Sequence, residues 1–398
     1  MGDFLNIINQ NLDNFPNTNK KDDLINKLFI GDKPILDVGL IKKFKLDEIK
    51  SNEKYFYFIN SSLLTENNII KNYIDFFDKS LINVMIHNKN VNIVFIEIFE
   101  FEKLSSIKHV INSFKSINID PKQLYFINNN YNLSHFKNEN LIESNTHTIK
   151  FLPRMVVNLM RSHTNSYYSY REKFFVCYNR TPRLHRKILL AYLMKNNLLD
   201  DTDWTLLLGD FNESLGMKMD FLSNDDLIDI EDYLNYINTI KQKKSIYELN
   251  IESIGQFDGV NWDEVFKNNA YTNSYVNIIT ETLYNSSNVH ITEKSFKPFY
   301  YYQLPVFVSS YQHVKRMREN YDLDFFDDVI DHSYDNEKDD RLRFHMIVNE
   351  IVRLYSNKNI IIDFFLKNEY RFQLNRDKIL KISDDKSDAD YIKKLNNG

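Results

Sequence analysis

Basic side chains gather where a helix is expected to begin, in the segment NRTPRLHRKILLAYLMKNN (179–197). Thr181 can cap that helix and Pro182 suits its first position. Four cations crowd the N-terminus of that helix, namely Arg180, Arg183, Arg186 and Lys187. Cations are unfavourable there because the helix macrodipole already places positive charge at its N-terminus. The segment indicates either a solvated basic turn or a site for a polyanion, most simply a diphosphate.

A second possible helix start lies in HITEKSFKPFYYYQLPVFVSS (290–310). Thr292 can cap this helix, Glu293 favours its first turn, and Lys294 projects from the same turn. Pro298 is expected to limit or kink the helix. These residues alone fit an ordinary ion pair at a helix start as well as they fit an anion site.

Several familiar chemical motifs are missing from the sequence. It has no G-x-G-x-x-G and no G-x-S-x-G, and its ten histidines form no H-x-H or H-x-x-x-H pair. A glycine-cradled dinucleotide or P-loop site, a serine-hydrolase elbow and a histidine metal site are therefore not expected. Asp-x-Asp occurs at Asp201/Asp203 and at Asp322/Asp324, which we interpret as chance in an Asp-rich chain. We predict neither a cofactor nor a metal.

The composition is that of a globular protein whose net charge creates no strong electrostatic field. The 398 residues include 50 basic and 55 acidic side chains, for a net charge of -5, and 43% are hydrophobic. Such a balance does not attract nucleic acid. No apolar run approaches the roughly 18 residues of a membrane span, and the first residues lack a signal-peptide pattern. Cys177, the single cysteine, is expected to be a buried strand residue. We predict a cytoplasmic protein with no membrane partner.

Short apolar runs alternate with helical patterns along the chain. Strands are expected at YFYFI (55–59), VNIVFIEIF (91–99), QLYFIN (123–128), KFFVCYN (173–179), WTLLL (204–208), YVNIITETLY (275–284) and PVFVSS (305–310). Helices are expected at 63–79, 103–116, 183–196, 229–243 and after Thr292. Near-continuous apolar strands between helices are typical of parallel sheets covered on both faces.

Two such series predict two Rossmann-like halves with a cleft between them, in an α/β fold. The polar stretch RSHTNSYYSYREK (161–173) favours a boundary near 160–172. We therefore expect an N-terminal domain over 1–165, a second domain over 172–355, and a charged helical segment over 356–398.

The segment ITETLYNSSNVHITEKSFKPFYYYQLPVFVSS (279–310) resembles the donor-binding segment of GT-B glycosyltransferases related to the α-1,3-fucosyltransferases. FVCYNRTPRLHRKILLAYL (175–193) is similar to the first strand-helix unit of that donor domain. The stretch 321–351 resembles the tail of virus-encoded glycosyltransferase-like proteins. The resemblance covers about 175–355. The chain departs from the family in the longer spacer between Glu281 and Glu293 and in the Phe-Lys-Pro that follows Glu-Lys-Ser.

The resemblance implies a GT-B fold, with an acceptor-side domain over 1–165 and a nucleotide-sugar donor domain over 172–355. It also assigns roles to residues of this chain. Arg186 and Lys294 would hold the nucleotide diphosphate, Glu293 would face the ribose or the sugar as a catalytic residue, and Thr292 would cap the helix. The implied nucleotide-sugar-binding set is completed by Asn179, Arg180, Arg183 and Glu281. Fixed cations can stabilise a departing diphosphate without a metal.

A base for the acceptor is expected in the N-terminal half. VFIEIFEFEK (94–103) places Glu97, Glu100 and Glu102 at the end of a predicted strand. Carboxylates at strand C-termini face the ligand crevice of open parallel sheets. We favour Glu100 as the base, while a solvated edge carboxylate is the alternative interpretation.

The sequence thus predicts a metal-independent glycosyltransferase that moves a sugar from a nucleotide-diphosphate sugar to a hydroxyl acceptor such as a glycan. If it is virus-encoded, it would work in the host cytoplasm. One alternative is a DNA-modifying glycosyltransferase acting on a hydroxylated base, supported only by the short basic clusters KQKKS (241–245) and HVKRMR (313–318). Another is a non-catalytic binding protein that retains the fold.

Overall fold

The structure, a computed structural model, divides into two compact units. It describes residues 29–30, 33–34, 55–60, 74, 79–97, 104–128, 130–131, 145–148, 150, 157, 168–179, 183–206, 221–240, 271–286, 288–382, 387 and 391. The first unit comprises Met1–Phe151 with Asp385–Gly398, and the second comprises Leu152–Asp384. The division falls earlier than the boundary expected near 160–172. Both units contain a parallel sheet, which confirms the α/β prediction.

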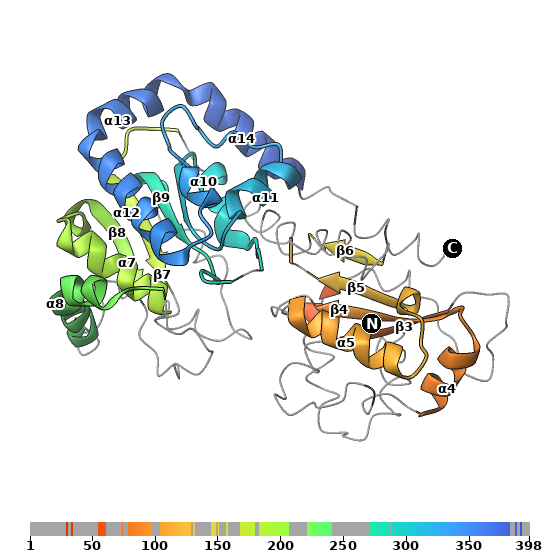
Figure 1. The fold of residues 1–398 in the computed structure, drawn as a ribbon. Helices are drawn as coiled ribbons and strands as arrows, with labels where there is room; N and C mark the ends of the chain where they lie inside the picture. The colour runs from red at the N-terminus through yellow and green to blue at the C-terminus, as the bar shows by residue number, and fades with distance from the viewer. Residues whose placement is uncertain are drawn as a thin grey trace. The chain divides into compact units, whose positions relative to one another are not determined.

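The first unit holds a four-stranded sheet in the order β3-β4-β5-β6 (Figure 1). Its strands are β3 (Tyr55–Asn60), β4 (Val91–Glu97), β5 (Leu124–Asn128) and β6 (Thr146–Thr148), with helices α4 (Lys79–His87) and α5 (Leu104–Ser116) and the 3-10 turn η5 (Pro121–Gln123). Phe95 packs its ring on Phe126 at 5.1 Å and against Phe114 at 6.1 Å. A short antiparallel pair, β1 (Phe29–Ile30) and β2 (Lys33–Pro34), precedes them. The helix expected over 63–79 lies mostly outside the described residues.

The second unit contains the longer run of described elements and a sheet in the order β8-β7-β9-β10. These strands are β7 (Lys173–Asn179), β8 (Thr202–Leu206), β9 (Ser274–Thr280) and β10 (Leu304–Val308), all parallel to their neighbours. β7 has the predicted bounds, whereas β9 ends at Thr280 rather than continuing to 284. Cys177 is fully buried in β7, as expected.

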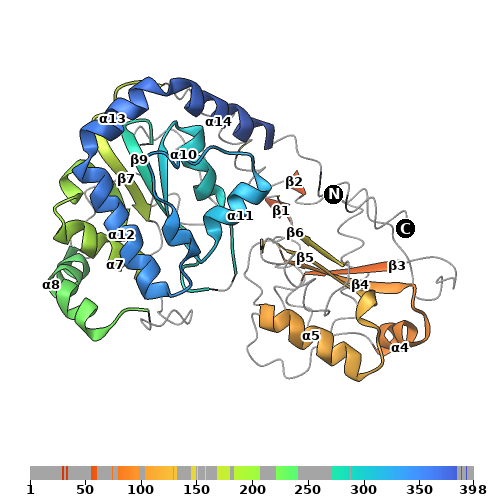
Figure 2. The ribbon, with the colours of Figure 1, turned by 45° about the horizontal axis from the view of Figure 1, so that its top comes forward.

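Helices cover both faces of this second sheet, as Figure 2 shows. They are α7 (Leu184–Lys195), α8 (Asn224–Ile240), α10 (Lys297–Tyr300), α11 (His313–Asn320), α12 (Asp340–Ser356), α13 (Lys358–Lys367) and α14 (Glu369–Ile382), with the 3-10 turns η7 (Leu199–Asp201), η10 (Glu293–Phe296) and η11 (Ser333–Asn336). α7 packs on α8 and α12, and α10 packs on α14. Within the segment expected over 356–398, the structure describes the helices α13 and α14, and both belong to the second unit rather than to a separate segment.

The strand order of the second unit defines where a ligand can bind. The chain leaves β7 through α7 to β8 on one side, and it leaves β9 through α10 to β10 on the other. Such an order creates a switch point between β7 and β9, beyond whose carboxyl ends open α/β sheets bind their ligands. The right-handed crossover rule places α7 and α10 on opposite faces of the sheet.

Two fully buried arginines fasten the loops at the two ends of this sheet. Arg171 donates from Nη1 to the carbonyls of Tyr271 and Ser274 and from Nη2 to that of Tyr301. Arg343, on α12, donates to the carbonyls of Ser309, Glu337 and Tyr284. Buried cations are retained only when such partners compensate their lost hydration. Within the described residues, none of the helices is long and apolar enough to cross a bilayer.

Candidate functional site

The side-chain amide of Asn179 is buried at the carboxyl end of β7. Asn179 has no exposed surface, and its Nδ2 donates to the Cys177 sulfur at 3.3 Å. Its backbone N–H donates to the Thr205 hydroxyl at 3.1 Å, and its Oδ1 accepts from the Thr280 hydroxyl. Asn179 therefore joins three adjacent strand ends, and this role differs from the ligand contact that the resemblance implies.

Helix α7 begins at Leu184, with Arg183 at the N-cap position. The cap expected at Thr181, the first-position Pro182 and the site residue Arg180 all lie outside the described residues. Arg183 is partly exposed, and its Nη1 donates to the carbonyl of Thr282 at 2.6 Å. The first turn of α7 contains no acidic residue, so its dipole and its cations act in the same direction.

Arg186, one helical turn further on, is only 3% exposed. Its Nη2 donates to the carbonyl oxygens of Thr280, at 3.1 Å, and Glu281, at 3.4 Å. These carbonyls end β9, so Arg186 links α7 to the strand across the switch point. Arg186 is therefore a buried positive charge, and its guanidinium already donates hydrogen bonds to the backbone.

Glu281 is the hub of the switch point. It is 1% exposed, and its carboxylate accepts hydrogen bonds from Thr282 N at 3.2 Å, from Thr292 N at 3.2 Å and from the Ser295 hydroxyl at 2.5 Å. The Thr292 hydroxyl reaches both carboxylate oxygens. Burial raises the pKa of Glu281, but Lys294, His313 and Ser295 more than offset this and hold it below its ordinary value. Glu281 therefore fastens the turn that carries the next two charged residues.

The helix expected after Thr292 is a 3-10 turn, η10, followed by the single short helix α10. Thr292 is its N-cap as predicted, and its hydroxyl accepts from the N–H of Lys294 at 3.2 Å. Glu293 and Lys294 form an ion pair at 3.0 Å, with side chains 22% and 27% exposed. Solvent reaches this pair as well as Arg183.

The charged residues at this point act on one another and form one group. We call them the switch-point cluster: Arg183, Arg186, Glu281, Glu293, Lys294 and Lys297. Lys297 was not expected in the site; it is 8% exposed, and its Nζ donates to the Tyr271 hydroxyl at 3.2 Å. Burial lowers the pKa of Lys297, while Glu293 and Glu281 favour its charged form. Four cations face two carboxylates, so the described cluster carries an excess of positive charge.

The histidines near this cluster do not add to that excess at neutral pH. Burial lowers the pKa of His185 well below its ordinary value, and it lowers the pKa of His290 to about 4. His313 is shifted in the same direction by burial, although Glu281 and Asp335 oppose the shift of its pKa. His185 donates from Nε2 to the carbonyl of Glu281 at 3.0 Å. Of these three rings, His185 holds the backbone at Glu281 and His313 contacts the Ser295 side chain.

Glu293 is suited to binding rather than to proton transfer. Burial raises its pKa, but Lys294 and Lys297 outweigh burial and hold the pKa at about 2. A general base works best with a pKa near the operating pH. Glu293 therefore remains ionised and can accept hydrogen bonds from ligand hydroxyls, which favours the expected contact with a ribose or sugar over a role as a base. Glu100, the predicted base, lies outside the described residues.

The depressed pKa of Glu293 predicts an acid-sensitive contribution to stability. Because its folded-state pKa lies below the unfolded value, the contribution is present above about pH 4.5 and is lost as pH falls toward 2. We expect Glu293→Gln to lose stability at pH 7 and to show a flatter decline of unfolding free energy over that window. Urea unfolding at a series of pH values measures this, and parallel pH profiles for both proteins would contradict it.

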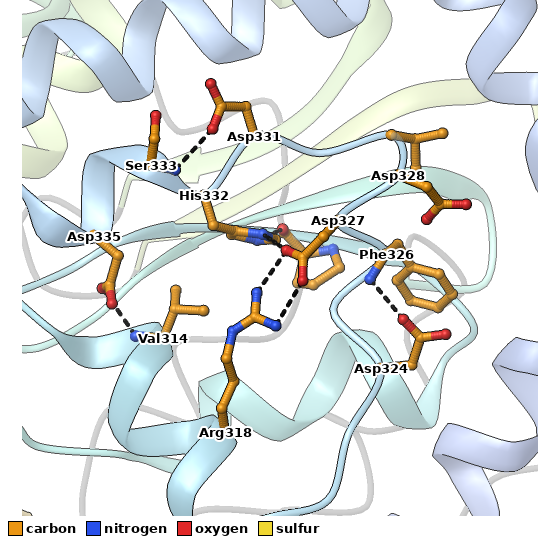
Figure 3. A network of polar contacts seen from close by, with 12 residues as sticks. Val314, Arg318, Asp324, Phe326, Asp327, Asp328, Asp331, His332, Ser333 and Asp335 are labelled. Carbon is orange, nitrogen blue, oxygen red and sulfur yellow. Dashed lines mark hydrogen bonds and ion pairs between the residues drawn. The ribbon is translucent and has the colours of Figure 1, made fainter.

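A separate pocket of about 600 Å³ lies beside α11, and Figure 3 shows its polar network. Asp327 accepts two hydrogen bonds from Arg318, both at 2.6 Å, and one from His332 Nδ1 at 3.0 Å. Asp328 is paired with Arg371 at 2.6 Å. These carboxylates are satisfied by the protein itself, so we assign the pocket a structural role.

The remaining polar motifs of the sequence are also engaged within the fold. In the basic cluster 313–318, Arg316 pairs with Glu319 and Arg318 with Asp327. The cluster 241–245 lies outside the described residues. In the Asp-x-Asp pairs, Asp201 contacts Lys358 and Asp324 contacts Arg371. Among the described residues, no group of three or more His, Cys, Asp or Glu side chains could hold a metal ion.

Ser295, Lys297 and His313 belong to the site but were not predicted from the sequence. Ser295 and His313 have no exposed surface, and the Ser295 hydroxyl lies 2.9 Å from His313 Nε2. Ser295 and Lys297 lie one and three positions after Lys294, so proximity in the motif was a usable signal for them. His313 comes from the next strand-helix connection, and no local pattern indicates it.

Comparison with known protein families, with curated proteins and with solved structures finds no match for this chain.

Proposed function

We propose that the second unit binds a nucleotide-diphosphate sugar at the switch point between β7 and β9, and that the chain is a glycosyltransferase of the GT-B type. The excess positive charge of the switch-point cluster is the observation that carries this proposal. Four cations converge at one edge of the sheet, and a diphosphate is the kind of group that several converging cations bind. The N-terminus of α7 adds its dipole to the same attraction.

The roles of the individual residues follow from their exposure. Lys294 and Arg183 are the partly exposed cations and would contact the phosphate oxygens directly. Arg186 and Lys297 are buried and would act through their charge at short range. Glu293 would accept hydrogen bonds from hydroxyl groups of the ribose or the sugar, since it stays ionised at neutral pH.

In the proposed reaction, the acceptor oxygen forms a bond to the anomeric carbon while the bond from that carbon to the diphosphate breaks. The electron pair leaves with the diphosphate, and a base takes the acceptor proton. Negative charge therefore grows on the diphosphate, next to cations that are already in place, and preorganised charges of this kind lower barriers most. Glu100 remains the predicted base. The cleft between the two domains also remains a prediction.

A nucleotide panel tests the proposal without knowledge of the acceptor. GDP, UDP, TDP and CMP compounds would each be added to the full chain while its melting curve is recorded. A ligand at 100 times its Kd stabilises the folded state by about 2.7 kcal/mol. We expect a nucleoside diphosphate to raise the melting temperature more than CMP does. If none of the compounds shifts it, the donor site is refuted.

Donor binding is expected to survive removal of divalent metal. The proposed site neutralises the diphosphate with fixed side-chain cations, which can replace a metal in that role. Adding EDTA should therefore leave the affinity for the bound nucleotide and the turnover unchanged within about twofold. Activity that vanishes with EDTA and returns with Mn²⁺ would instead require a metal-assisted mechanism.

A further inference from the structure

Buried hydrogen bonds connect Glu281, Ser295 and His313 next to the Glu293–Lys294 pair. We call these three residues the relay. The Ser295 hydroxyl donates to Glu281 at 2.5 Å and lies 2.9 Å from His313 Nε2. Ser295 has a single hydroxyl proton, and the short contact to the carboxylate uses it. His313 must therefore donate from Nε2 to the Ser295 oxygen.

His313 is itself held firmly in place. Its ring packs on Phe307 of β10 at 5.3 Å, and the residue before it, Gln312, has a left-handed backbone with φ 64°. Such a conformation persists only where the surroundings impose it. The Asp335 carboxylate supplies that restraint by accepting from Val314 N and from Lys315 N, each at 2.9 Å. Figure 3 shows the contact between Asp335 and Val314.

The relay therefore connects the segments that follow two adjacent strands. Glu281 follows β9, His313 follows β10, and Ser295 in η10 lies between them. η10 is a single 3-10 turn, too short to hold its own geometry. Its backbone depends on the carboxylate of Glu281, which is oriented by Ser295 and through it by His313.

We infer that Ser295 and His313 are positioning residues that hold η10 so that Lys294 faces the diphosphate and Glu293 the ribose or sugar. This inference rests on the proposed function for its ligand, but the relay itself can be observed without one. It also assigns Glu281 to support of the turn, in place of the donor contact that the resemblance implies.

The test compares His313→Leu with His313→Gln in the full chain. Leu removes the donor, whereas the Gln amide can offer an N–H near the position of Nε2. Ser295→Ala is the second variant, and it keeps His313 in place if His313→Leu does not fold. Amide hydrogen exchange is followed in the peptide that spans 288–300, and affinity is measured by calorimetry with GDP and UDP at a temperature where every variant is folded.

We expect His313→Leu and Ser295→Ala to speed exchange in this peptide by about tenfold and to weaken nucleotide binding by about tenfold, the scale of one lost buried hydrogen bond. His313→Gln should stay within about threefold of the parent protein. Unchanged exchange overturns the relay, and faster exchange with unchanged affinity overturns its positioning role. If the parent binds neither GDP nor UDP, the proposed donor fails, and the exchange rates alone decide whether the relay holds η10.

Discussion

Replacing Lys294 or Arg183 by Ala should lower sugar transfer by about 10²–10³-fold, the usual effect of removing one preformed electrostatic contact to a transition state. Both cations are partly exposed at the carboxyl edge of the sheet, where the departing diphosphate would gather charge. Turnover of the nucleotide sugar, measured as nucleoside diphosphate released, is the quantity to compare.

The Lys294→Ala protein should still fold, although it loses the charge that holds the pKa of Glu281 and Glu293 low. Its ion pair with Glu293 is partly solvated, and pairs of this kind contribute about 1 kcal/mol or less. Lys315→Ala is the matched control, since Lys315 is an exposed cation in the same unit and lies outside the switch-point cluster. We expect the control to keep full turnover. Equal losses in Lys294→Ala and Lys315→Ala would show that general charge, and not this site, is responsible.

Arg343→Met should destabilise the second unit by about 3–5 kcal/mol, the range for breaking a buried, partnered charge. Arg343 is 1% exposed and satisfies the carbonyls of Tyr284, Ser309 and Glu337. Methionine fills much of the same volume but offers no donor, so three buried carbonyls would lose their partner. Chemical denaturation reports the change in unfolding free energy.

Arg318→Met is the matched control for that measurement. Arg318 also forms a two-bond contact, with Asp327, but its side chain is 37% exposed. Solvent can replace the lost bonds there, and we expect a change below about 1 kcal/mol. If the two substitutions cost the same, burial does not determine the importance of these arginines.

Arg186→Ala tests a residue that contributes both positive charge and structural support to the site. The resemblance implied that Arg186 holds the diphosphate directly, whereas the local pattern indicated only a cluster of cations at the start of the helix. The structure adds what the pattern could not show, namely that its guanidinium is buried against the carbonyls of Thr280 and Glu281. The Arg186→Ala variant should therefore lose nucleotide affinity and should also lose more unfolding free energy than Lys294→Ala does.

The strands were the most predictable part of the second unit. β7 has the expected bounds because KFFVCYN is a continuous apolar run closed by Asn179, and β10 begins within one residue of the expected start. β9 ends before the expected 284 because Glu281 turns away to accept bonds from Thr292 and Ser295. Those partners are eleven and fourteen positions away, beyond the reach of a local pattern.

The same reason explains which site residues escaped prediction. Thr292, Glu293 and Lys294 stand in one short motif, and its spacing alone suggests a capped turn with an ion pair. His313 joins them only because β9 and β10 are neighbours in the sheet. Lys297 was not assigned to the site, because its burial beside Tyr271 depends on how α10 packs on the sheet.

Titration of GDP and UDP into the full chain and into Lys294→Ala, followed by calorimetry, tests the donor site most directly. We predict that the full chain binds at least one of them and that the substitution weakens that binding by about tenfold or more while the variant remains folded at the temperature of the titration. A full chain that binds neither nucleotide, or a variant that binds as tightly as its parent, would contradict the proposed site.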